Sequence, residues 1–366
     1  MIVGLFPGLA SVGGIQMAGR QTAAALSSIA NERGWSCVFL SLNDANGEQD
    51  AAVGGLHFKF RGFHRNKPRF IAAALRLTFA RPNVIFAAHS YLAPITAAMH
   101  VLAPQARIIV GTHGIEVWQR LSVIRRKALR DADIVLAPSS DTARKLMDVQ
   151  GVRAEHIRRL PWPLDPEFLG LANSPDHLPR PRQFPQDRVV LSVGRWAANE
   201  RYKGADLLIH AVSELTREFP DLHLVFVGTG DDLPRLQEVA RATTSPDNIH
   251  FISNLSRHEL AACYASCDIF ALPSTGEGFG LVFLEAMAFH KPVIGTGSGG
   301  IPDIVENGVT GILIEPENLS SLSGALRSLL SNDAARLQIG QQGAKAVRSR
   351  YNFESFRNAL AGYCRK

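Results

Sequence analysis

The segment from residue 272 to residue 300 decides the fold, and it reads LPSTGEGFGLVFLEAMAFHKPVIGTGSGG. The apolar run 269–272 is typical of a buried parallel strand, which would end at Pro273. A glycine-rich turn over 276–280 opens a predicted helix, and a second predicted strand covers 292–295. A strand, a turn, a helix and a strand in this order predict a β-α-β unit of an α/β domain.

The glycine-rich turn has the chemistry of an anion site. Backbone N–H groups of such a turn, and the positive end of the following helix dipole, can approach an anion. Two carboxylates, Glu277 in the turn and Glu285 eight residues later, would lie at the rim and on the wall of a pocket. By spacing alone, a crossover with structural glycines and solvated acids explains the segment equally well.

Three stretches resemble the signature of a known family: EGFGLVFLEAMA (277–288), PVIGT (292–296) and GGIPDIVENGVTG (299–311). They are similar to the E-x7-E region of the retaining glycosyltransferases of family four, the glycosyl transferases group 1. That family has the GT-B architecture. The resemblance therefore implies an α/β protein of two Rossmann-like doubly wound domains that face each other across a cleft.

Composition and length agree with a globular protein of two domains. The chain has 366 residues, of which 46% are hydrophobic and 20% charged, and no run of eighteen apolar residues. The start, MIVGLFPGLA, reads as a first strand and not as a signal peptide. Four cysteines without a C-x-x-C pair indicate a reducing compartment, so we expect a cytoplasmic protein.

The order of strands and helices predicts where the domains begin and end. Seven prolines over 161–187, with little periodicity, indicate a linker. We expect an N-terminal acceptor-binding domain over 1–165, the linker over 166–187 and a C-terminal donor-binding domain over 188–350. The last segment, 351–366, is expected to return to the N-terminal domain as a helix, as in GT-B proteins.

Two cations in the second half are candidates for diphosphate binding. Gly194-Arg195 follows a predicted strand over 189–193, and Lys203-Gly204 opens the next helix. The pair resembles the family's diphosphate clamp, since arginine can bond two phosphate oxygens and lysine supplies a point charge. The segment 196–202 between them is slightly long for the family pattern. The plainer interpretation is an ordinary surface arginine and lysine.

The resemblance implies further site residues. His113, in T-H-G-x-E, would face the donor sugar, Gly13-Gly14 would lie against the diphosphate, and Asn254 would stand near the nucleotide base. The catalytic residues implied are Glu277, His113, Arg195 and Lys203. The donor-binding residues implied are Gly13, Gly14, Arg195, Lys203, Asn254, Glu277, Gly278, Phe279, Gly280, Leu281 and Glu285.

The family's reaction is the transfer of a hexose, here of the mannose or glucose type, from a nucleoside diphosphate sugar with retention. The acceptor would be a sugar or a lipid-linked glycan in cell-surface glycan biosynthesis. Arg195, Lys203 and turn N–H groups would stabilise the negative charge that grows on the leaving phosphate. Glu277 would bind sugar hydroxyls and Glu285 the ribose diol. We expect no cofactor and no metal, because these cations would replace the metal and no histidine ligand pair is present in the sequence.

The N-terminal half is basic, with 21 Lys and Arg against 13 Asp and Glu over residues 1–180. No acid lies between Asp50 and Glu116, and cations there are interleaved with aromatic residues. The aromatic residues are Phe58, Phe60, Phe63, Phe70 and Phe79. This pattern predicts peripheral docking on the anionic inner face of the cell membrane or on a lipid-linked acceptor. A solvated basic face is the plainer interpretation, and no nucleic-acid partner is expected.

Three other function classes stay open at this point. A sugar-nucleotide 2-epimerase shares the two-domain architecture, but such enzymes lack the E-G-F-G-L…E motif. A non-catalytic lipid-surface protein could keep the same fold. An NAD-binding protein would need G-x-G-x-x-G and an acid after the second strand, for which Asp44 is a faint candidate. The sequence does not name the sugar, the base or the acceptor.

Overall fold

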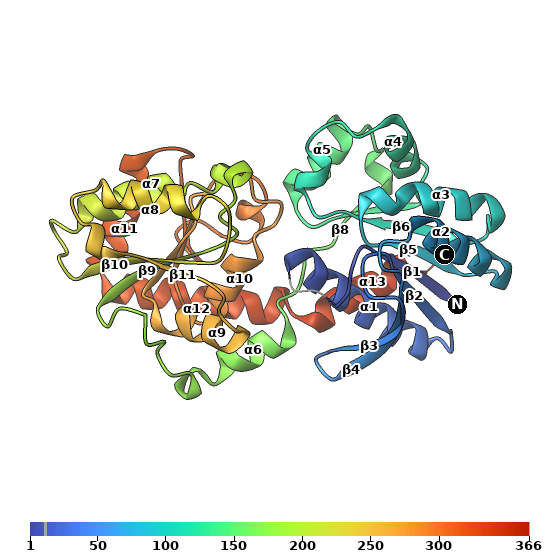
Figure 1. The fold of residues 1–366 in the computed structure, drawn as a ribbon, viewed down its shortest axis with the longest axis horizontal. Coiled ribbons are helices and arrows are strands. Elements are labelled where there is room, and N and C mark those ends of the chain that lie inside the picture. Colours follow the sequence, from blue (N-terminus) through green and yellow to red (C-terminus); the bar gives the residue numbers. More distant parts are fainter. Residues whose placement is uncertain (11–12, 366) are drawn as a thin grey trace. The chain divides into compact units, whose positions relative to one another are not determined.

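The computed structural model describes residues 1–10 and 13–365, which form two compact units (Figure 1). The N-terminal unit comprises Met1–Pro166 and Tyr351–Lys366, and the C-terminal unit comprises Glu167–Arg350. Each unit is a sheet of mainly parallel strands with helices on both of its faces. This is the doubly wound α/β class that the sequence predicts.

The sheet of the N-terminal unit has the strand order β3-β4-β2-β1-β5-β6-β7-β8. All neighbouring strands are parallel except the hairpin of β3 and β4. Its central strands are continuous buried runs, because helices cover both faces of the sheet. The strands are β1 (Ile2–Phe6), β2 (Cys37–Ser41), β3 (Gly47–Val53), β4 (Leu56–Gly62), β5 (Val84–Ala87), β6 (Arg107–Gly111), β7 (Ile134–Ala137) and β8 (Ile157–Arg159).

Helices of the N-terminal unit include one from the far end of the chain, α13. The guanidinium group of Arg33, just after α1, donates hydrogen bonds to the carbonyls of Ala361 and Cys364 at 2.7 and 3.0 Å. These bonds hold the C-terminal segment in the unit where the sequence analysis placed it. The helices are α1 (Gly14–Glu32), α2 (Lys67–Arg76), α3 (Ala93–Leu102), α4 (Val123–Arg130), α5 (Ser140–Asp148) and α13 (Phe353–Tyr363).

The sheet of the C-terminal unit has the order β11-β10-β9-β12-β13-β14, and every neighbouring pair is parallel. All carboxyl ends therefore lie at one edge, which is where open α/β sheets bind ligands. The strands are β9 (Arg188–Val193), β10 (Leu222–Val227), β11 (Ile249–Ile252), β12 (Ile269–Ala271), β13 (Val293–Thr296) and β14 (Ile312–Ile314). The helices are α6 (Pro166–Asn173), α7 (Ala205–Leu215), α8 (Leu233–Arg241), α9 (Arg257–Ser266), α10 (Leu281–Ala288), α11 (Leu319–Leu330) and α12 (Asp333–Arg350).

The segment 166–187, predicted to be a linker, begins with helix α6. Phe168 of this helix is 2% exposed, and its ring packs edge-on against Tyr264 and Phe289 at centroid distances of 5.9 and 5.5 Å. The first part of the predicted linker is therefore a helix that packs within the C-terminal unit. Pro166 is compatible with this helix because it is the first helical residue, and the first N–H groups of a helix have no partner within the helix.

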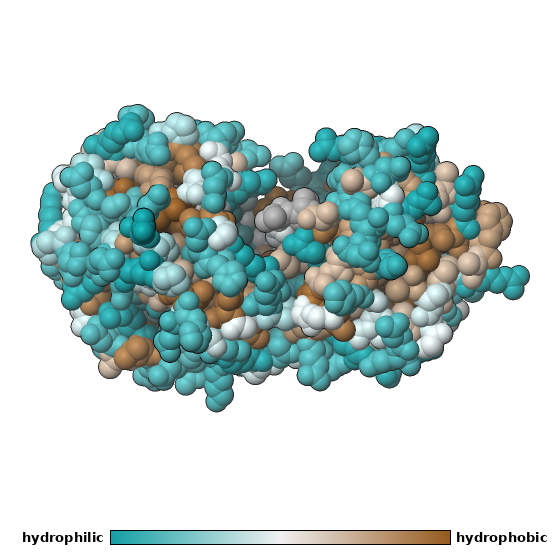
Figure 2. Space-filling model, turned by 60° about the horizontal axis from the view of Figure 1, so that its bottom comes forward, coloured by the Kyte–Doolittle hydropathy of each residue, from teal (hydrophilic) through white to brown (hydrophobic). Residues whose placement is uncertain are grey.

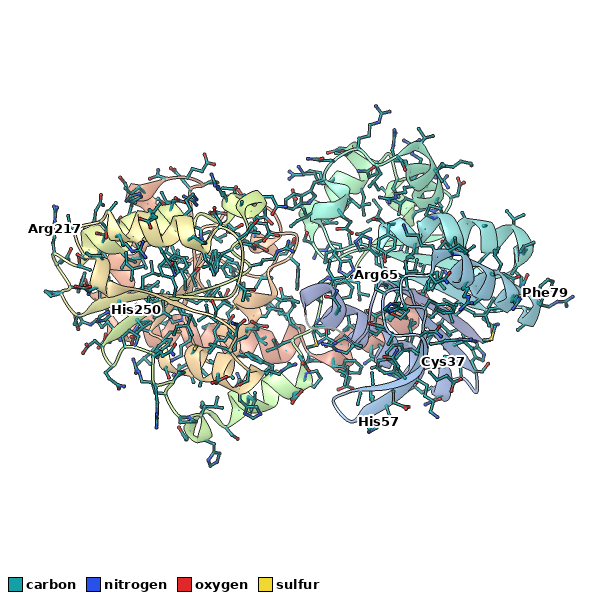
Figure 3. The ribbon with its side chains drawn as sticks, in the orientation of Figure 1. Cys37, His57, Arg65, Phe79, Arg217 and His250 are labelled. Carbon is teal, nitrogen blue, oxygen red and sulfur yellow. The ribbon has the colours of Figure 1, made fainter. Side chains whose placement is uncertain are left out.

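The aromatic residues of the basic stretch are mostly core residues, which corrects the predicted membrane contact. Phe58, Phe60, Phe63 and Phe70 are at most 5% exposed. Along β4 the buried rings alternate with exposed cations, because successive side chains of a strand point to opposite faces. Phe79 differs: it is 84% exposed and lies at the right-hand end of its unit in Figure 3. Within the described residues, no helix combines the length and apolar character needed to cross a membrane.

Candidate active site

Three predicted site residues meet at the carboxyl edge of the C-terminal sheet. Arg195 follows β9, Lys203 precedes α7, and Glu277 lies in the loop between β12 and α10. Because β9 and β12 are neighbours, their loops lie side by side. The Nζ of Lys203 is 2.9 Å from Oε1 of Glu277, and only 12% and 13% of the two side chains are exposed. Such a buried ion pair depends on good geometry, since both charges have lost most of their hydration.

A fourth charged residue, Glu200, joins these three and was not predicted. Its carboxylate accepts a hydrogen bond from the guanidinium group of Arg195, and its Oε2 lies 3.8 Å from Nζ of Lys203. The side chain of Glu200 is 9% exposed, whereas that of Arg195 is 69% exposed. Positive and negative charges therefore alternate from Arg195 through Glu200 and Lys203 to Glu277. We call these four residues the charge cluster.

The loop between β9 and α7 turns Glu200 inward. Residues Ala198–Lys203 form a 3-10 segment whose backbone is not helical at Glu200. Trp196 fixes the start of the loop, since it is 3% exposed and its Nε1 donates to the carbonyl of Val227 at 3.2 Å. Gly204 fixes its end: φ is +72°, and a Cβ there would lie 2.6 Å from the carbonyl oxygen of Pro273. The long segment noted in the sequence is thus what brings Glu200 to the two cations.

The backbone of Glu277 is held by the glycine-rich turn after β13. Gly299 has a φ of +62°, and a Cβ at this position would lie 2.5 Å from the carbonyl oxygen of Glu277. The N–H of Gly300 donates to the same carbonyl at 2.8 Å. The N–H of Thr275 donates to the carbonyl of Tyr202 at 2.8 Å, which joins the two loops of the charge cluster. These contacts give Glu277 a fixed position beside Lys203.

The second acid of the motif, Glu285, lies in helix α10. The helix begins at Leu281, after Gly278, the buried Phe279 and the left-handed cap Gly280, so Glu285 lies about one turn inside it. Oε2 of Glu285 accepts a hydrogen bond from the hydroxyl of Tyr264 at 2.8 Å. Burial raises the pKa of Glu285 to about 7, although that hydrogen bond and the charge of Arg257 act in the opposite direction. The carboxyl group is therefore partly protonated at neutral pH.

Asn254 lies at the same sheet edge but is not part of the charge cluster. It follows β11, which β10 separates from β9, and it is exposed with a left-handed φ of +58°. The hydroxyl of the preceding Ser253 donates to the carbonyl of Gly228 at 2.7 Å, which fixes this turn beside the glycine turn after β10. In the part of the chain that is described, no three His, Cys, Asp or Glu side chains are arranged to hold a metal ion.

In the N-terminal unit, His113 lies at the carboxyl end of β6 in an aromatic cluster. Its Nε2 is 2.8 Å from the carbonyl oxygen of Ala88, so Nε2 carries a proton and donates to that oxygen; in the neutral tautomer that this bond selects, Nδ1 is the acceptor. The ring stacks on Trp162 and lies beside His89, at centroid distances of 5.2 and 5.5 Å. Burial, with His113 and Arg125, lowers the pKa of His89 to about 3, so that neighbour stays neutral.

Gly13 and Gly14 lie at the start of α1, where Gly13 is the cap and Gly14 the first helical residue. After β1, Leu9 is held by Asp44, whose Oδ2 accepts from the N–H of Leu9 and the hydroxyl of Ser41, both at 2.6 Å. Asp44 is 7% exposed. Its carboxylate is therefore occupied by hydrogen bonds within the protein, so Asp44 does not support the NAD-binding interpretation.

Two family models match the chain. The model described as "Glycosyl transferases group 1" matches residues 175–346, and the model described as "Glycosyltransferase Family 4" matches residues 12–168. The first match lies in the C-terminal unit and the second mostly in the N-terminal unit.

Curated relatives of similar length resemble the chain over most of both sequences. A GDP-mannose-dependent alpha-(1-6)-phosphatidylinositol monomannoside mannosyltransferase of Mycolicibacterium smegmatis is 32% identical over 267 residues, which are 68% of each chain. The protein of the same name in Mycobacterium tuberculosis is 29% identical over 287 residues, 74% of each chain.

Solved structures share the fold over almost the whole chain. Sucrose-phosphate synthase from Thermosynechococcus elongatus has a TM-score of 0.77 and 21% identity, with 99% of this chain and 97% of that chain covered. Anabaena Alr3699/HepE in complex with UDP-glucose has a TM-score of 0.75 and 18% identity, with 99% and 98% covered.

Proposed function

The chain belongs to the family-four glycosyltransferases, the glycosyl transferases group 1, with the GT-B fold, and we propose that it is a retaining hexosyltransferase. The donor is a nucleoside diphosphate sugar with a hexose of the mannose or glucose type. The observation that carries the proposal is the charge cluster at the carboxyl edge of the sheet, in which Lys203 pairs with Glu277 and Arg195 pairs with Glu200. The activity for which the mannosyltransferase relatives are named and the UDP-glucose complex of the structural neighbour support this donor class.

The reaction breaks the bond between the sugar and the diphosphate, so negative charge grows on the leaving phosphate. Arg195 and Lys203 stabilise that charge, and a well-placed donor of this kind contributes about 2.7–4 kcal/mol to the transition state. Glu277 accepts hydrogen bonds from sugar hydroxyls, and His113 offers Nδ1 as a further acceptor. Glu285 accepts from both hydroxyls of the ribose, which a single carboxylate can do.

Binding of the sugar donor changes the ion pair of Lys203 and Glu277. A diphosphate carries more negative charge than one carboxylate, so it draws the ammonium group toward itself. Glu277 is then free to accept hydrogen bonds from the sugar. We propose that these side chains make the reaction independent of a metal ion, so that EDTA leaves the rate unchanged.

The acceptor is a sugar or a lipid-linked glycan of the cell surface, and the N-terminal unit docks peripherally on the cytoplasmic face of the membrane. Since four of the predicted aromatic residues are buried, the contact has to be made by other residues. Helix α4 offers Val123 and Ile124, which are 78% and 71% exposed. The cations Arg120, Arg125, Arg126, Lys127 and Arg130 lie within seven residues of them. Exposed apolar residues among cations suit an anionic lipid surface.

Transfer assays with GDP-mannose and with UDP-glucose, each with and without a mannoside or lipid-linked acceptor, test the proposed function. We expect release of the nucleoside diphosphate to depend on the acceptor with one of these donors. Free sugar released at the same rate without acceptor would indicate the 2-epimerase alternative. Full activity of the Arg195→Ala, Lys203→Ala double variant would rule out their role at the diphosphate.

A further inference from the structure

Tyr202, beside Lys203, has a buried hydroxyl group. Its ring lies 5.5 Å from Nζ of Lys203, measured to the ring centroid. Tyr202 is therefore next to the charge cluster through its neighbour Lys203. Among the described residues, no hydrogen-bond partner reaches the hydroxyl. A buried polar group without a partner costs free energy, so it calls for an explanation.

The neighbours of Tyr202 explain why the hydroxyl finds no partner within the protein. Its backbone is fixed, because its carbonyl accepts the N–H of Thr275 at 2.8 Å. The ammonium group of Lys203 is directed to Glu277, and the guanidinium group of Arg195 is directed to Glu200. The charged groups around the phenol therefore bond to one another and leave its hydroxyl without a partner.

We propose that Tyr202 binds the nucleoside diphosphate sugar, and that its hydroxyl donates a hydrogen bond to an anionic oxygen of the diphosphate. This inference rests on the proposed function. The Lys203 ammonium group lies over the Tyr202 ring, so a phosphate that draws Lys203 from Glu277 would bind next to this side chain, whose hydroxyl has no partner within the protein. Burial and Glu277 raise the pKa of Tyr202 to about 12, so the phenol keeps its proton for donation at neutral pH.

Tyr202→Phe is the direct test, because it removes the hydroxyl and keeps the ring. Calorimetry with GDP and UDP is expected to show about a tenfold to hundredfold weaker affinity than in the wild type, the range for a hydrogen bond to a charged group. The affinity for guanosine and uridine, which lack phosphate, should not change. The melting temperature should stay the same or rise, since a buried unsatisfied group is removed.

Ser323→Ala is the matched control. Ser323 lies in α11, a helix that holds no residue of the charge cluster, and its Oγ is likewise buried without a partner. Its removal should leave GDP and UDP affinity unchanged. If Tyr202→Phe binds the diphosphate as tightly as the wild type, the proposal for Tyr202 is overturned and the proposed function stands. If the wild type binds neither GDP nor UDP, both fall.

Discussion

At the scale of single residues, the proposed chemistry depends on charges that are already paired in the structure. The 2.9 Å contact of Lys203 with Glu277 holds both side chains in position at low exposure. A ligand that replaces one partner therefore meets a group that is oriented in advance, and orientation of this kind lowers the barrier of the reaction. Removing the carboxylate of Glu277 should therefore affect sugar transfer and leave nucleotide binding in place.

Glu277→Gln should reduce kcat about a hundredfold or more, since a group that acts on the reacting sugar is lost. Binding of GDP or UDP should be as tight as in the wild type or tighter, because Lys203 loses its competing carboxylate. Steady-state kinetics at saturating donor and calorimetry with the nucleotide measure the two effects. Glu238→Gln, at an acid that is 71% exposed, serves as the control. Near-wild-type turnover of Glu277→Gln would show that Glu277 has no role at the sugar.

The raised pKa of Glu285 predicts a pH dependence with a defined sign. The usual carboxyl pKa is 4.5 and the folded value is about 7, so between these values the folded protein holds a proton that the unfolded chain releases. The free energy of unfolding should therefore fall as pH rises through this window, relative to Glu285→Gln. Urea unfolding of both proteins at several pH values measures this. An equal dependence on pH in both would mean that Glu285 does not titrate there.

At the scale of elements, the site residues lie in loops, and the parallel strands bring these loops to one edge of the sheet. The strand, helix and glycine pattern predicted the order of the elements well, and the acidic motif indicated Glu277. Glu200 and Tyr202 could not be singled out, because their roles depend on how the loop between β9 and α7 folds back. Strand β3, with the sequence GEQDAAV, has no continuous apolar run to mark it, since it lies at the sheet edge and its residues alternate between half-buried and exposed up to the buried Val53.

Substitutions at Glu200 test whether that loop positions the cations. Glu200→Ala removes the group that holds Arg195, so we expect affinity for GDP or UDP to fall by about tenfold. Glu200→Gln keeps an acceptor for Arg195 and should lie closer to the wild type. Affinity for the nucleoside alone should not change in either variant. Tighter diphosphate binding by Glu200→Ala would show that Glu200 merely competes with the ligand for the cations.

At the scale of the whole molecule, the two units differ in charge and in the surfaces they expose. Residues 181–366 hold 18 Lys and Arg against 20 Asp and Glu, so the cationic excess belongs to the N-terminal half. Figure 2 shows apolar residues among hydrophilic ones on the surface of both units, so exposed apolar area alone does not identify a docking face. The N-terminal unit is distinguished by apolar residues that have cations around them, as on α4.

Replacing Val123 and Ile124 by Asp should cut binding to anionic vesicles by about tenfold or more, since two apolar contacts are lost and two like charges are added. Co-sedimentation with phosphatidylserine vesicles at low salt measures this. Leu337→Asp, at a residue of α12 that is 63% exposed, is the matched control in the other unit and should bind like the wild type. High salt should release the wild type. If the wild-type protein does not co-sediment with these vesicles at low salt, the proposal of membrane docking is contradicted.

The central claim is that the charge cluster supports transfer of a hexose with retention of configuration. The most direct measurement is a time course of proton NMR spectra with an α-linked nucleoside diphosphate hexose and a mannoside acceptor. We predict that the first product formed carries the α configuration, and that the Lys203→Ala variant forms it far more slowly. A product that appears first in the β configuration, or a Lys203→Ala variant as fast as the wild type, would contradict the claim.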